Sequence, residues 1–163
     1  MQPLVERRPS VVMVGMGQSE CGRGEDRFSS ILGSCIAICL YSRQRGVGAI
    51  AHVVMPASHG RDSAPGKSAD TAVPHLLDLL RKEGISARDV EAKIAGGASM
   101  FKISAGTLQI GQANITACTA ELERVGIPIV GRDVGGDKGR RIHFECGTGQ
   151  VRVEIIGCPA TTL

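Results

Sequence analysis

Cys35 and His52 are the residues of this sequence whose types and spacing most clearly suggest a chemical reaction. They lie within residues 32–56, a segment in which two apolar runs surround the polar residues 42–45. A polar break between two β-prone runs is typical of a β-hairpin. If the turn is centred on the middle of this break, Cys35 and His52 are direct cross-strand neighbours, with Cβ atoms about 4.5–5.5 Å apart.

At that separation an imidazole can take the proton of a thiol and leave a thiolate nucleophile. We therefore expect Cys35 to be the nucleophile, with a lowered pKa and the fastest alkylation of all the thiols, and His52 to be its base. Gly33 and Ser34 precede Cys35, so the backbone there can turn sharply and present N–H groups as an oxyanion hole. A third group usually orients the histidine. Ser29 lies on the face of Cys35 if the strand is regular, and can do this through its hydroxyl or its carbonyl.

Each of these residues also has a purely structural interpretation. A cysteine in a strand is ordinarily a small apolar filler, and a histidine in an apolar strand commonly bonds to a backbone carbonyl. Cys39 shares the strand face of Cys35 but has no matching histidine, so it is assigned to the core. The combination of Cys35, His52 and the Gly33 turn favours the catalytic interpretation for this pair.

Composition argues against several other classes of site. Only 2% of the 163 residues are aromatic and none is Trp, which disfavours base-stacking and sugar-binding surfaces. A net charge of +3 without a dense basic stripe disfavours duplex binding. The cysteines form no Cys-x-x-Cys pair, and the glycine-rich segments GGASMF and DVGGDKGR lack the P-loop and G-x-G-x-x-G patterns. We therefore expect no metal and no cofactor.

The sequence also predicts where the protein resides. It contains no apolar stretch of the roughly 20 residues that a membrane-spanning helix needs. Residues 1–10 lack the apolar core of a signal peptide. We therefore expect a cytoplasmic protein whose cysteines are free thiols.

Hydrophobic periodicity and the glycine positions predict one domain over residues 11–157, with a mobile N-terminal tail (1–10) and a C-terminal tail (158–163). Helices are expected over about 71–83, capped by Asp70, and over about 111–125. Residues 18–26 and 56–67 are expected to be loops. Strands are expected at 11–16, 27–32, 36–41, 47–55, 90–94, 127–133, 141–145 and 151–155. Because strands cluster at both ends of the sequence, the fold class expected is α/β in the sense of a layered α+β domain.

Several segments together resemble the chemoreceptor glutamine deamidase family, CheD. They are LGSC at 32–35, CLY at 39–41, the strand that contains His52 and ends at Pro56, KIAGGASMF at 93–101, IGQAN at 110–114, GIPIVGRDVGGDKGRRIHF at 126–144 and TGQVRV at 148–153. The resemblance spans nearly all of the chain from residue 11 to about 155. It implies a CheD-like single domain, a β-sandwich-like sheet core flanked by helices.

The activity implied by the resemblance is hydrolysis of specific glutamine side chains of methyl-accepting chemotaxis receptors to glutamate, with release of ammonia, through a cysteine thioester. The family's cysteine falls on Cys35 and its histidine on His52. Its third member, usually threonine, falls on Ser29, which keeps a hydroxyl. The implied partners are the cytoplasmic helices of the receptor and a CheC-type phosphatase, without nucleic acid and without membrane insertion. Two alternatives stay open: a non-enzymatic adaptor that binds a CheC-type phosphatase, and a papain-like thiol hydrolase.

Overall fold

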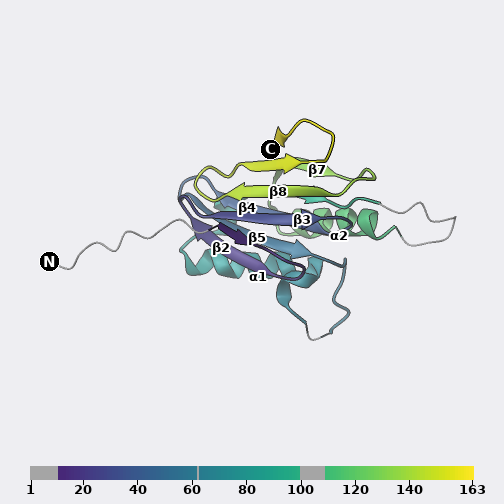
Figure 1. Cartoon of the computed structure of the whole chain (residues 1–163). Helices are drawn as coiled ribbons and strands as arrows, with labels where there is room; N and C mark the ends of the chain where they lie inside the picture. Colours follow the sequence, from purple (N-terminus) through teal and green to yellow (C-terminus); the bar gives the residue numbers. More distant parts are fainter. Residues whose placement is uncertain (1–10, 62, 100–108) are drawn as a thin grey trace.

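Two β-sheets that pack face to face, with two α-helices on one side of them, build the fold (Figure 1). The computed structural model describes residues 11–61, 63–99 and 109–163. The first sheet has the strand order β1 (Val11–Met13), β3 (Arg27–Leu32), β8 (Arg140–Glu145), β9 (Val151–Glu154) and β10 (Thr161–Thr162). The second has the order β2 (Ser19–Arg23), β5 (Val47–Val53), β4 (Ile36–Ser42), β6 (Glu91–Gly96) and β7 (Ile129–Val134). The helices are α1 (Ala69–Lys82) and α2 (Ile110–Arg124), with short 3₁₀ helices η1 (Pro65–Lys67) and η2 (Ala87–Asp89).

The core forms two layers that meet at the second sheet. Strand β4 is buried along its whole length, because its alternate side chains face opposite layers. Ile36, Ile38 and Leu40 belong to the layer that contains the buried faces of α1 and α2. Ala37 and Cys39 belong to the layer between the two sheets. The predicted layered α+β fold is therefore confirmed, with both helices on the outer face of the second sheet.

The register of the β4–β5 hairpin differs from the one predicted. His52 pairs with Ala37, and Ser42 pairs with Val47, so the connection is the four residues 43–46 rather than a two-residue turn. Gly46 accommodates the tighter end of this loop with a φ of +61°. The prediction that Cys35 and His52 are direct cross-strand partners is wrong. The shift is two residues, which keeps each side chain of the hairpin on the same sheet face. Cys35 precedes β4 but packs in the same layer as Ala37, the residue that pairs with His52.

The beginning of α1 also differs from the prediction. The helix starts at Ala69 after Ser68, and the predicted N-cap, Asp70, lies within the first turn. The Asp70 carboxylate instead accepts hydrogen bonds from the backbone N–H and the hydroxyl of Ser58, at 3.0 and 2.9 Å. Asp70 therefore ties the loop after His52 to the start of α1.

Two further segments are more ordered than the sequence indicated. Residues 18–26, expected as a loop, contain β2, which pairs with β5. Residues 158–163, expected as a tail, include β10, and Leu163 N–H donates to the Val151 carbonyl at 2.8 Å. The predicted N-terminal tail, residues 1–10, lies outside the described residues. No helix in the described part of the chain is both long and apolar enough to cross a membrane.

Candidate active site

Cys35, the candidate nucleophile, lies in a turn whose three backbone carbonyls each accept a hydrogen bond. Residues 33–35 connect β3 to β4. The carbonyl of Gly33 accepts from Ala98 N–H at 2.9 Å, and that of Cys35 accepts from Gly97 N–H at 2.8 Å. The carbonyl of Ser34 accepts from the side-chain amide of Asn114 at 3.0 Å. Cys35 itself is 8% exposed, so only a small part of the residue meets solvent.

A glycine at the end of β6 makes this close approach possible. Gly96 has a φ of +113°, and a Cβ built there would lie 2.1 Å from the Cys35 carbonyl oxygen. Only a residue without a side chain can take this conformation beside another backbone. The glycines of the KIAGG segment therefore serve to fix the turn that carries Cys35.

His52 is buried, and its ring has a defined orientation. Its Nδ1 lies 3.0 Å from the carbonyl oxygen of Val14. Because a carbonyl can only accept, Nδ1 carries the proton and Nε2 is left with a free lone pair. Nε2 is buried and has no hydrogen-bond partner among the described residues, Cys35 included. The ring is thus held as a base whose proton-accepting nitrogen is unoccupied.

Two further hydrogen bonds hold Val14, one at its carbonyl and one at its N–H. Ser30, which is fully buried, donates its hydroxyl to this same oxygen at 2.6 Å. The N–H of Val14 donates to the Ser29 carbonyl at 2.7 Å. Gly17, three residues after Val14, also binds the backbone of His52, because its N–H donates to the His52 carbonyl at 2.8 Å. The segment after β1 therefore positions both the ring and the backbone of His52.

The Ser29 side chain points away from this site. Along β3, Phe28 and Leu32 face the layer between the sheets, whereas Arg27 and Ile31 are exposed. Ser29 alternates with the exposed set, and its hydroxyl oxygen lies 2.8 Å from Nδ1 of His143 on β8. The predicted contact from the Ser29 hydroxyl to His52 is therefore not formed, and the Val14 carbonyl takes that place.

Electrostatics favour a neutral pair at rest. Burial raises the pKa of the Cys35 thiol above its usual value. Burial lowers the pKa of His52, against an opposing effect of the hydrogen bond to the Val14 carbonyl. The predicted lowering of the Cys35 pKa is not found. The thiol would lose its proton during the reaction, to a neutral imidazole, rather than exist as a preformed thiolate.

Three residues of this arrangement escaped the sequence analysis. Val14 acts through its backbone, which leaves no signal in a side-chain type. Ser30 was passed over because its neighbour was assigned to the wrong strand face. Asn114 did carry a signal, since it is a polar residue within the buried stripe of α2 that includes Ile115 and Cys118.

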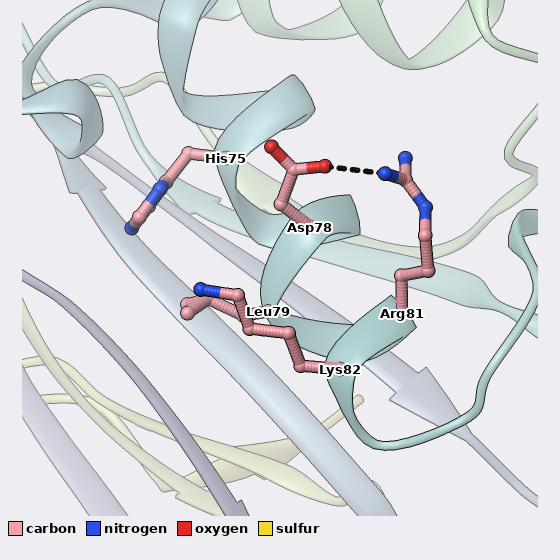
Figure 2. A pocket seen from close by; sticks show the side chains of 5 residues that line it. All are labelled: His75, Asp78, Leu79, Arg81 and Lys82. Atoms are coloured by element: carbon pink, nitrogen blue, oxygen red, sulfur yellow. Dashed lines mark ion pairs between the residues drawn. The ribbon is translucent and has the colours of Figure 1, made fainter.

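The described surface includes two hollows that differ in their relation to Cys35. One, of about 820 Å³, borders Gly33 and is lined by the ends of β3 and β9 and the β7–β8 loop, with Ile31 and Ile156 among its exposed apolar residues. The other, of about 330 Å³, lies on α1 (Figure 2). It displays His75 and Lys82 beside the Asp78–Arg81 ion pair of 2.9 Å, and its lining contains no cysteine. Only the first adjoins the Cys35 turn.

No group of three or more His, Cys, Asp or Glu residues in the described ranges is arranged to hold a metal ion. The six cysteines are all free thiols. The groups that the layer between the two sheets offers for chemistry include the thiol of Cys35, the imidazole of His52 and the backbone amides of the turn.

Comparison with known proteins places this arrangement in a family. Residues 54–155 match the family model described as CheD chemotactic sensory transduction. A probable chemoreceptor glutamine deamidase CheD of Methanococcus vannielii is 42% identical over 88% of this chain and 94% of its own length. The chemoreceptor glutamine deamidase CheD of Thermotoga maritima is 44% identical over 77% of this chain and 79% of its own length. A probable CheD of Pyrococcus abyssi is 40% identical over 90% of this chain and 93% of its own length. The predicted resemblance is confirmed, and the chain belongs to the CheD family.

Proposed function

We propose that this protein is a protein-glutamine glutaminase that converts specific glutamine side chains of chemoreceptors to glutamate. The observation that carries the proposal is the state of His52. Its Nδ1 is fixed by the Val14 carbonyl, while its Nε2 has no partner among the described residues. Cys35 packs in the layer between the two sheets together with Ala37, the residue that pairs with His52. A base with one nitrogen anchored and the other open, in the layer that holds a thiol, is suited to nucleophilic catalysis.

In the first half of the reaction, Nε2 of His52 takes the proton of the Cys35 thiol as the sulfur attacks the carboxamide carbon. The carbon–sulfur bond forms, and the carbonyl π electrons move onto oxygen. The N–H groups of Ser34 and Cys35 stabilise this oxyanion, because the carbonyls of the same turn are already directed elsewhere. Gly33 is not among the glycines with positive φ in the described residues, and its part in the turn is the carbonyl that accepts from Ala98 N–H.

The imidazolium then protonates the leaving nitrogen, and the carbon–nitrogen bond breaks to release ammonia and leave a thioester on Cys35. His52, neutral again, takes a proton from water as the water oxygen attacks the thioester. The carbon–sulfur bond breaks, the thiol recovers a proton, and the product is a glutamate side chain. The lowered pKa of His52 keeps it in the base form at neutral pH.

Ser29 has a backbone role in this proposal. Its carbonyl fixes the N–H of Val14, and the carbonyl of Val14 fixes His52. The position that matches the family's third member thus acts on His52 through one intervening residue rather than through its own hydroxyl. Cys35 and His52 remain the two residues that touch the reacting atoms.

The proposed substrate follows from the names of the relatives, which are chemoreceptor glutamine deamidases. We take the substrate to be the cytoplasmic helices of a methyl-accepting receptor, and the place of action to be the cytoplasm. A CheC-type phosphatase is a second proposed partner, on the family resemblance alone. The relatives' names give no support to a papain-like thiol hydrolase or a non-enzymatic adaptor.

The test is mass spectrometry of a purified chemoreceptor cytoplasmic fragment after incubation with the protein. Ammonia release and the mass change of amide to carboxylate at particular glutamines are expected, and both should vanish in Cys35→Ala and His52→Ala. Cys39→Ala is the matched control, because Cys39 is a buried thiol on the same strand face. Cleavage of the fragment would indicate a thiol hydrolase, and binding without any mass change would indicate an adaptor.

A further inference from the structure

Asn114 connects the two halves of the active site from outside the hairpin. It lies on α2, is fully buried, and uses its side-chain amide nitrogen for two hydrogen bonds. One goes to the carbonyl of Ser34 at 3.0 Å, and the other to the carbonyl of Val54 at 2.9 Å. Ser34 directly precedes Cys35, and Val54 lies two positions after His52. A single side chain therefore holds the backbone beside both catalytic residues.

The bond to Ser34 has a direct consequence for Cys35. The Ser34 carbonyl and the Cys35 N–H belong to one planar peptide unit and, in the trans form, point in opposite directions; the described residues contain no cis peptide. Fixing the carbonyl therefore fixes the direction of the Cys35 N–H. The backbone hydrogen bonds among the described residues include none from this N–H, so none of those residues competes with a substrate oxygen for it.

We infer that Asn114 is a positioning residue that sets the oxyanion hole by holding the Ser34–Cys35 peptide plane. The inference rests on the proposed deamidation. It assigns a role in the reaction to α2, a helix that contributes no nucleophile or base. Asn114 acts through the peptide that it holds and does not itself contact the substrate.

The unsatisfied half of the Asn114 side chain supports this role. Its Oδ1 is buried and has no hydrogen-bond partner among the described residues, and leaving a buried acceptor unpaired is costly. An apolar residue would avoid that cost at this position in the helix core. The side-chain amide provides two N–H groups that bind two backbone carbonyls. This geometry is useful where the direction of a peptide plane has to be fixed.

The test separates oxyanion stabilisation from activation of the thiol. Deamidation passes through an oxyanion, whereas alkylation of Cys35 by iodoacetamide displaces iodide and forms none. In Asn114→Ala we expect kcat to fall about tenfold to a hundredfold, somewhat less than the ~10²–10³ cost of removing an oxyanion donor outright. We expect KM to stay within about twofold of the wild-type value. The rate of Cys35 alkylation, measured by peptide mapping across a range of pH, should stay within the same margin.

Two variants keep the result interpretable if Asn114→Ala is poorly folded. Asn114→Leu retains much of the side-chain volume without the N–H donors, and should show the same loss of kcat. Cys118→Ala removes another fully buried side chain from the same face of α2, one turn later, without touching the turn. It should retain kcat even if its melting temperature drops as far.

Three outcomes would count against the inference. Unchanged kcat in a folded Asn114→Ala or Asn114→Leu variant would overturn it. A parallel loss of kcat and of the Cys35 alkylation rate would also overturn it, because it would mean that Asn114 acts on the reactivity of the thiol rather than on the oxyanion. If the wild-type protein releases no ammonia from the receptor fragment, the proposed function itself fails, and the inference fails with it.

Discussion

Replacing Ser30 by alanine should slow the reaction, although Ser30 touches neither the nucleophile nor the substrate. Its hydroxyl donates to the Val14 carbonyl at 2.6 Å, and the same carbonyl accepts from Nδ1 of His52 at 3.0 Å. Ser30→Ala leaves this carbonyl with one of its two side-chain donors. The imidazole then loses part of the support that fixes its angle toward Cys35.

The size of the effect can be estimated from the bond that is lost. A buried neutral hydrogen bond contributes on the order of 1 kcal/mol to stability, which for a domain of this length shifts the melting temperature by about 2–4 °C. If a similar energy, about 1.4 kcal/mol, is lost from the transition state through a misoriented base, kcat falls about tenfold. KM should stay near its wild-type value, because Ser30 is fully buried and does not meet the substrate.

The assay compares ammonia release by Ser30→Ala with that of two matched serine variants. Ser29→Ala removes the neighbouring hydroxyl, which bonds His143 on the outer side of β3, so its kcat should change by less than about twofold. Ser42→Ala removes a buried hydroxyl that has no hydrogen-bond partner in the described part of the chain, and should also be active. Ser30→Thr, which keeps the hydroxyl, should recover part of the lost kcat.

A large loss of kcat in Ser29→Ala, with Ser30→Ala near wild type, would refute this reasoning. It would show that the hydroxyl of Ser29 reaches His52 in the working enzyme, as the sequence first indicated. Equal small effects in all three alanine variants would also contradict it, because they would mean that the Val14 carbonyl needs no support from Ser30.

The remaining predictions concern pH, thiol reactivity and one glycine. Burial lowers the pKa of His52 from 6.5, so the acid limb of the kcat/KM profile should lie below pH 6.5. The stability linked to neutral His52 should be present above pH 6.5. It should be lost as the pH falls through the pKa of His52 in the folded state. Because burial raises the Cys35 pKa above 9.0 whereas Cys158 is exposed, iodoacetamide mapping at neutral pH should label Cys158 first and Cys35 increasingly above pH 9. Gly96→Ala should abolish activity and lower the melting temperature, because its Cβ would collide with the Cys35 carbonyl. Gly126→Ala, also at positive φ but with open space around its Cβ, should cost only about 1 kcal/mol of stability.

The sequence predicted the hairpin and the shared face of Cys35 and His52, but not their register. The four-residue loop moved the pairing by two positions, and a shift of two preserves the face because side chains alternate with a period of two. Cys35 precedes β4, but it packs in the same layer as Ala37, which pairs with His52, so the two residues lie in one layer despite the wrong assumption about the turn. The same reasoning failed for Ser29, because the count from Cys35 to Ser29 ran through residues 33–35, where the strand has ended and alternation no longer holds.

The difference between Ser29 and Ser30 shows which parts of this site a sequence can reveal. Strand β3 itself was predicted with its observed bounds, Arg27–Leu32. Counting from its buried residues Phe28 and Leu32, instead of from Cys35, places Ser30 on the inner face and Ser29 on the outer one. Counting along a strand cannot identify the hydrogen-bond acceptor of His52, because every residue has a backbone carbonyl. The parallel pairing of β1 with β3 brings the Val14 carbonyl to the histidine. Asn114 lies between these cases. A polar amide in the buried stripe of α2 signals a partner in the core, but the fold alone shows that the partner is the backbone beside Cys35.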